Sequence, residues 1–66
     1  MKLLELLKVL DKDLYVEVYN LRADRIIKAK VDELLLHDIG LWEKEVLSVN
    51  PEHTTRQNYL EITLVD

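Results

Sequence analysis

Few side chains in this sequence of 66 residues have the types and spacing that catalysis or metal binding requires. His37 and His53 are its two histidines, and it has no cysteine. His37 and Asp38 could supply two ligands to a metal ion, but adjacent residues rarely converge on one ion without a third ligand. We therefore expect no metal site, and we interpret His37 as a surface residue at a helix end.

Nucleophilic catalysis needs a hydroxyl or thiol beside a positioned base. Thr54 and Thr55 follow His53 directly, but consecutive loop residues seldom point at one another, and Ser48 has no basic neighbour in the sequence. The single glycine of the chain cannot build a loop that cradles phosphate. We expect a protein that is not an enzyme and uses no cofactor, and a small hydrolase centred on His53 stays as an alternative.

Glu17 and Glu61 are the carboxylates that strand periodicity could bring onto one surface. Such a pair performs acid–base catalysis when burial or a neighbouring charge separates the two pKa values. An open sheet face offers little burial, so we interpret Glu17 as the ion-pair partner of Lys28.

One face of the predicted sheet, which we call the outer face, has the most distinctive composition. Its members follow from the period of two along residues 14–19, 26–31 and 59–65, since alternate side chains of a strand share a face. The candidate binding residues there are Tyr15, Glu17, Tyr19, Lys28, Lys30, Tyr59 and Glu61, beside the apolar Ile26, Val46 and Val65. All three tyrosines of the chain are included, and tyrosine with a few charges is typical of recognition surfaces. The alternative interpretation is that tyrosine simply suits strands.

The outer face predicts a small binding protein that contacts another protein. The alternative is a module that binds nucleic acid or a small nucleotide by stacking bases on the tyrosines. Thirteen acids against nine bases give a net charge of −4, which disfavours nucleic acid because that binding depends on Lys and Arg. The same charge disfavours anionic membranes.

The length of the chain allows one domain, residues 1–66, of low expected stability. Without cysteine no disulfide can add stability, so we expect self-association into a homo-oligomer. Lys2, Glu5 and Lys8 interrupt the apolar start of the chain, which therefore lacks the apolar core of a signal peptide. We expect a cytoplasmic location.

The first half of the chain has the clearest periodicity. Leucines at three- and four-residue spacing predict an amphipathic helix over residues 2–10. Residues 14–31 predict a β-hairpin whose connection is residues 21–24. The alternation of apolar and polar side chains sets the register of this hairpin, because a slip of one residue would turn the apolar side chains of one strand toward solvent. The predicted pairs are Leu14 with Val31, Val16 with Ala29, Val18 with Ile27, Glu17 with Lys28 and Tyr15 with Lys30.

The second half is less regular. Asp32 is the predicted N-cap of a short helix over residues 33–37, with Gly40 as the residue that ends it. Trp42 is interpreted as a lid on the core, with an interface anchor as the alternative. Strands follow at residues 45–49 and 59–65, separated by a polar loop over residues 50–57. In the first of these strands, Leu47 and Val49 are predicted to face inward, and Val46 and Ser48 outward.

The predicted fold is therefore α+β, in the order helix, strand, strand, short helix, strand, strand. A four-stranded antiparallel sheet with the N-terminal helix packed on one face accounts for every apolar stripe. Tyr59 and Glu61 extend the outer face only if their strand adjoins the first one.

The chain resembles short, mostly uncharacterised proteins encoded by phages and prophages of low-GC Gram-positive bacteria. The resemblance lies in the leucine-rich helix and Asp/Lys turn over residues 3–13, the Tyr/Val strand at 14–20, and the closing strands at 45–49 and 59–65. It implies no functional residue. It implies a context, in which such small proteins bind and block a host protein, for example a defence factor such as a restriction or CRISPR nuclease.

Overall fold

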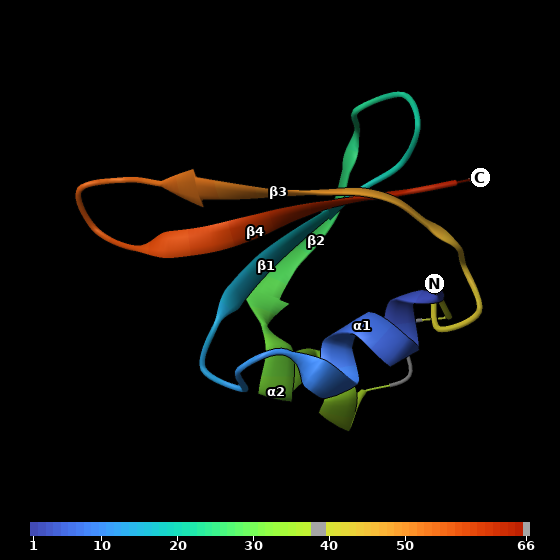
Figure 1. The fold of residues 1–66 in the computed structure, drawn as a ribbon, viewed down its shortest axis with the longest axis horizontal. Coiled ribbons are helices and arrows are strands. Elements are labelled where there is room, and N and C mark those ends of the chain that lie inside the picture. Colours follow the sequence, from blue (N-terminus) through green and yellow to red (C-terminus); the bar gives the residue numbers. More distant parts are fainter. Residues whose placement is uncertain (38–39, 66) are drawn as a thin grey trace.

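The computed structural model describes residues 1–37 and 40–65. Along the chain its elements are α1 (Leu3–Val9), β1 (Tyr15–Tyr19), β2 (Arg25–Lys30), α2 (Val31–Leu36), β3 (Val46–His53) and β4 (Asn58–Leu64) (Figure 1). The expected α+β composition, with an N-terminal helix and four strands, is confirmed.

The sheet is mixed, so the prediction of a fully antiparallel sheet is wrong. Its strand order is β2-β1-β4-β3, and the two central strands, β1 and β4, are parallel. The β1–β2 and β3–β4 pairs on either side are antiparallel hairpins. Parallel neighbours need a crossover connection of about a dozen residues or more. The chain between β2 and β3, residues 31–45, includes α2 and supplies that length.

The predicted register of the first hairpin is confirmed in its regular part. Val18 lies opposite Ile27, and Val16 lies opposite Ala29, so the apolar side chains of both strands share the inner face. A register shift between Val18 and Tyr19 then brings Tyr19 opposite Arg25. The remaining predicted contact, between residues 14 and 31, is a hydrogen bond from the Val31 N–H to the Leu14 carbonyl at 2.9 Å.

Asn20 shapes the turn of this hairpin. Its Oδ1 accepts hydrogen bonds from the backbone N–H of Arg22 at 2.9 Å and of Asp24 at 3.0 Å. Ala23 lies between these two donors with a φ of 63°, a left-handed conformation that residues with a Cβ rarely adopt.

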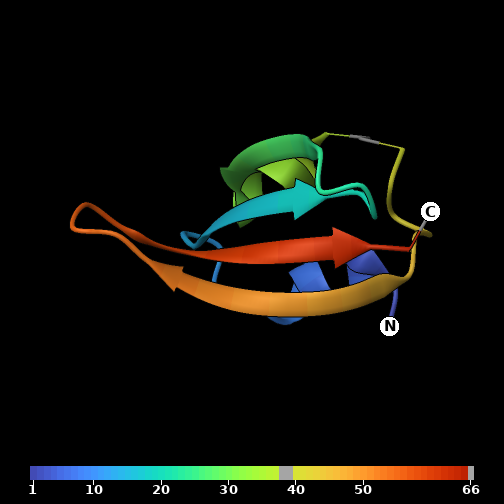
Figure 2. The same cartoon turned by 90° about the horizontal axis from the view of Figure 1, so that it is seen from above.

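The hydrophobic core lies between the inner face of the sheet and the two helices, which share one side of it (Figures 1 and 2). Its buried members are Leu3, Leu6, Leu7, Val16, Val18, Val31, Leu34, Ile62 and Leu64. Trp42 is partly buried against this cluster, as the lid interpretation predicts. Figure 1 also shows the β3–β4 hairpin extending beyond the helices.

Helix α1 is attached to the sheet at its first turn. The Leu3 N–H donates to the Lys44 carbonyl at 2.9 Å, and the Val46 N–H donates to the Met1 carbonyl at 2.8 Å. The Glu5 carboxylate accepts from the Lys2 backbone N–H at 2.9 Å and so caps the helix. The start of β3 is thereby paired with the N-terminus.

Helix α2 begins earlier than its predicted bounds of 33–37. It starts directly after β2, because Val31 is fully buried and anchors the first turn in the core. Asp32, the predicted N-cap, is inside the helix, and Lys30 occupies the N-cap position. Gly40 has the left-handed φ of 70° expected of it, but α2 already ends at Leu36.

Strand β3 corrects two predictions. It runs on through His53, so residues 50–53 are strand and not loop, and only the turn at residues 54–57 separates it from β4. A register shift between Val46 and Ser48 reverses the predicted orientation at its start. Val46 packs against the core, whereas the side chain of Leu47 is exposed, with 57% of its surface accessible.

Candidate functional site

The outer face is organised in three rows that cross all four strands. In the order β2, β1, β4, β3, the first row is Lys30, Tyr15, Tyr59, Glu52; the second is Lys28, Glu17, Glu61, Asn50; the third is Arg25, Tyr19, Thr63, Ser48. Because β4 adjoins β1, the structure brings all seven sequence-predicted site residues onto one surface. Basic side chains lie along β2, and aromatic and acidic ones lie along β1 and β4.

Glu17 is the centre of this surface and its most buried polar side chain, at 5% exposure. The Tyr19 hydroxyl donates to Glu17 Oε1 at 2.6 Å, and Arg25 Nη1 lies 3.5 Å from the same oxygen. Lys28 Nζ lies 3.8 Å from Oε2. A carboxylate on a central strand is tolerated here because a hydroxyl and two cations compensate its charge.

The two lysines of the outer face also lie over the tyrosine rings. Lys30 Nζ is 5.6 Å from the centre of the Tyr15 ring, and Lys28 Nζ is 5.7 Å from the centre of the Tyr59 ring. Both distances are within the range of cation–π attraction. Tyr15 and Tyr59 are direct neighbours on the two parallel strands, and both are half-buried. These four side chains therefore form one ordered aromatic and cationic patch.

The environment of Glu17 changes the acidity of the nearby tyrosines. The hydrogen bond to Glu17, burial and the charges of Glu17 and Glu61 together raise the pKa of Tyr19 to about 12. Burial, followed by the charges of Glu17, Glu61 and Glu52, raises the pKa of Tyr59. Both phenols therefore stay neutral, and able to donate hydrogen bonds, to a higher pH than an ordinary tyrosine does.

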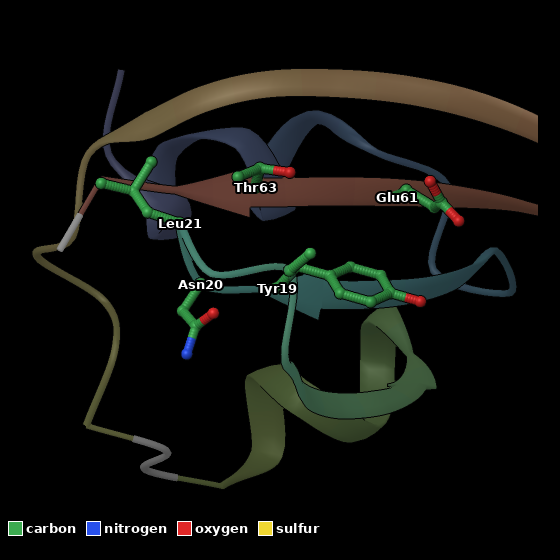
Figure 3. Close-up of a pocket in the computed structure, with 6 residues that line it drawn as sticks. Tyr19, Asn20, Leu21, Glu61 and Thr63 are labelled. Atoms are coloured by element: carbon green, nitrogen blue, oxygen red, sulfur yellow. The ribbon is translucent and has the colours of Figure 1, made fainter.

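A pocket of about 230 Å³ opens beside the third row of the outer face. It is lined by Tyr19, Asn20, Leu21, Ala23, Glu61 and Thr63. Figure 3 shows Tyr19 on β1 next to Glu61 and Thr63 on β4, with Leu21 at the far end and the Asn20 amide pointing away. Among the described residues, Glu61 has no cation within ion-pair distance and no hydrogen-bond donor. The half-buried carboxylate of Glu61 thus differs from that of Glu17.

Two of the residues considered for catalysis, His53 and Thr54, have other contacts. His53 Nδ1 lies 2.7 Å from Asn58 Oδ1 across the β3–β4 pair. The Thr54 hydroxyl donates to the Gln57 carbonyl at 2.9 Å and accepts from two backbone N–H groups of the same turn. His37 is exposed at the end of α2, and Asp38 lies outside the described residues. Across residues 1–37 and 40–65, no group of three or more His, Cys, Asp or Glu side chains could hold a metal ion.

Sequence reasoning missed Asn50 and Glu52, because residues 50–57 were expected to form a loop, and it also missed Arg25 and Thr63. Arg25 reaches Glu17 because of the register shift near Tyr19. The sequence gives no signal for this shift. Thr63 lines the pocket, and the period of two in β4, which places it with Tyr59 and Glu61, was a sufficient signal for it.

No protein-family model, curated protein or solved structure matches the chain. Within the described part of the chain, neither helix is long and apolar enough to cross a membrane.

Proposed function

We propose that this chain is a small non-enzymatic binding protein that contacts a protein partner through the outer face. The observation that carries the proposal is the patch of Tyr15, Tyr59, Lys28 and Lys30. Tyrosine is enriched at protein interfaces, where its ring supplies contact area and its hydroxyl supplies a hydrogen bond. The lysines over the rings hold these side chains in one arrangement before binding, which reduces the entropy that binding would cost.

The location of the patch supports this proposal. Both helices pack on the inner face, so the outer face is the open side of the sheet. Because the chain resembles small phage proteins that bind host proteins, we propose that its partner is a host protein in the cytoplasm. The chain would bind this protein and modulate it.

Self-association belongs to the same proposal. The first row of the outer face, Lys30, Tyr15, Tyr59 and Glu52, has a base at one end and an acid at the other. A second copy turned about an axis parallel to the strands would place its Glu52 over Lys30 and its Tyr59 over Tyr15. The first row is therefore complementary to itself, as the interface of a two-fold dimer must be. In the second row the same rotation sets Glu17 over Glu61 of the second copy, and this repulsion limits the affinity of the dimer.

Binding of single-stranded nucleic acid or a small nucleotide is the second candidate. The adjacent rings of Tyr15 and Tyr59, with two lysines beside them, resemble the stacking platforms of such proteins. The carboxylates of Glu17 and Glu61 in the next row oppose it, because they would repel phosphate. Titration with a mixed-sequence oligonucleotide and with cyclic dinucleotides, followed by tyrosine fluorescence, separates the two candidates.

Quantitative affinity capture from a bacterial host lysate tests the proposal. Three immobilised baits are compared: the parent chain, the double variant Tyr15→Ser/Tyr59→Ser, and the double variant Val9→Ser/Leu36→Ser. The control pair changes two highly exposed apolar side chains of α1 and α2, away from the outer face. We expect one or more proteins to bind the parent and the helix variant and to be lost from the tyrosine variant.

Far-ultraviolet circular dichroism of all three baits accompanies the capture. Equal capture by the three baits would show that the outer face is not the binding surface. Unfolding of the tyrosine variant would show that these rings belong to the core, and the proposal would then be wrong about the outer face.

A further inference from the structure

The pocket beside Tyr19 contains a charge that the rest of the outer face leaves uncompensated. Glu61 and Glu17 are opposite each other on parallel strands, and neighbouring strands are about 4.8 Å apart. Arg25 and Lys28 of β2 lie within ion-pair distance of Glu17, and among the described residues no cation lies within that distance of Glu61. A half-buried carboxylate beside another carboxylate gains more from an added cation than a solvated one would.

The other walls of the pocket suit one kind of cation. Tyr19 is held in place by its hydrogen bond to Glu17, so its ring is a fixed aromatic surface. The Thr63 hydroxyl adds a hydrogen-bond acceptor next to Glu61, and Leu21 adds an apolar edge. A guanidinium group stacks on an aromatic ring and donates to several acceptors in its own plane, and its alkyl stem packs against apolar surface. An ammonium group is a point charge that does not stack.

We propose that this pocket receives the arginine side chain of the protein partner, with its guanidinium between the Tyr19 ring and the Glu61 carboxylate. The net charge of −4 favours such a basic partner surface. The inference rests on the proposed function, because the arginine belongs to the proposed protein partner. It adds that this partner must present an arginine side chain at its binding surface.

The test uses N-acetyl-arginine N-methylamide as the probe and amide NMR chemical shifts of the full chain as the readout. The matched control is the corresponding citrulline compound, which replaces the guanidinium by an uncharged urea of nearly the same shape. We expect saturable shifts at Leu21, Glu61 and Thr63 with a dissociation constant on the order of 10–100 mM, as for one screened ion pair and one ring contact. Citrulline should bind at least about fivefold more weakly, a difference of about 1 kcal/mol.

Glu61→Gln is the decisive variant. It keeps the shape of the side chain and removes a charge that repels Glu17, so the fold should be retained. Arginine binding should fall to the level of citrulline binding in this variant. Equal binding of arginine and citrulline, unchanged binding to Glu61→Gln, or no saturable shift in the parent would each overturn the inference. Equal binding of the lysine compound would overturn the preference for guanidinium.

The tyrosine double variant Tyr15→Ser/Tyr59→Ser separates this inference from the proposed function. The two substitutions lie outside the pocket, so the variant should still bind the arginine probe while it loses capture of the protein partner. Loss of partner capture in Glu61→Gln as well would show that the partner supplies the arginine. Retained capture in Glu61→Gln would overturn the assignment of the arginine to the partner and leave the proposed function standing.

Discussion

Glu17 and Glu61 occupy opposite positions on the two central parallel strands, yet only Glu17 has cations within ion-pair distance among the described residues. The difference follows from the strand order. Strand β2 carries Arg25 and Lys28 and adjoins β1, whereas β3 places the uncharged Asn50 beside Glu61. The outer face therefore has a compensated carboxylate at its centre and an uncompensated one next to it.

Removing the Glu17 carboxylate should destabilise the fold. Glu17→Ala leaves the Tyr19 hydroxyl and two cations without their partner, and we expect a loss of about 1–3 kcal/mol in the free energy of unfolding. Glu17→Gln can still accept from Tyr19, so its loss should be smaller, about 1 kcal/mol. Urea denaturation followed by Trp42 fluorescence measures both. A Glu17→Ala variant as stable as the parent would show that the hydrogen bond and ion pairs of Glu17 contribute nothing to the stability of the fold.

Alkaline pH should destabilise the protein through Tyr19. The ordinary pKa of tyrosine, about 10, applies to the unfolded chain, and the fold raises the pKa of Tyr19 to about 12. Between these two values the unfolded chain has lost a proton that the folded chain retains. The contribution of Tyr19 is therefore complete below pH 10 and is lost as the pH rises from about 10 to about 12.

Two measurements check the Tyr19 prediction. Tyrosinate absorbance should show a titration step near pH 12 that is absent in Tyr19→Phe. The difference in stability between the parent and Tyr19→Phe should shrink over the same pH interval, which separates this effect from the titration of lysines in both proteins. A parent in which every tyrosine titrates at its ordinary pKa would contradict the hydrogen bond to Glu17.

The first hairpin could be predicted from the sequence because one physical rule determines it. Val16, Val18, Ile27 and Ala29 must share a buried face, and only one register allows that within a short connection. The same rule places Glu17 opposite Lys28. Arg25 escaped prediction because the register shift between Val18 and Tyr19 breaks the regular pairing that the rule assumes.

The direction of β4 could not be predicted by the same rule. Alternation along Tyr59, Leu60, Glu61 and Ile62 is identical for a strand that pairs in parallel or antiparallel fashion. The choice depends on the path of residues 31–45, whose weak periodicity says little about where they cross the molecule. The placement of Glu61 beside Glu17, and with it the pocket beside Tyr19, therefore needed the structure.

The hairpin turn at Ala23 should be improved by glycine. Ala23 has a φ of 63°, which costs an alanine about 1–2 kcal/mol, whereas glycine adopts this conformation freely. The more flexible unfolded chain offsets part of the gain, so we expect Ala23→Gly to raise the free energy of unfolding by up to about 1 kcal/mol. The control is Ala29→Gly in the extended strand β2, which should lower it by at least about 0.5 kcal/mol. Urea denaturation shows whether each variant raises or lowers the free energy of unfolding. A destabilised Ala23→Gly would contradict the left-handed conformation of Ala23.

The self-complementary row of the outer face predicts a dimer of the 7.8 kDa chain that weakens with salt. Lys30→Glu and Glu52→Lys should each weaken the dimer a few-fold, since each reverses one partner of an exposed ion pair. An equimolar mixture of the two variants should associate more tightly than Lys30→Glu alone, because both contacts between residues 30 and 52 in the mixed dimer again join opposite charges. Sedimentation equilibrium over a concentration series measures all of these constants. If the parent chain stays monomeric throughout, the second copy is not an occupant of the outer face, and a heterologous protein partner becomes the sole form of the proposal.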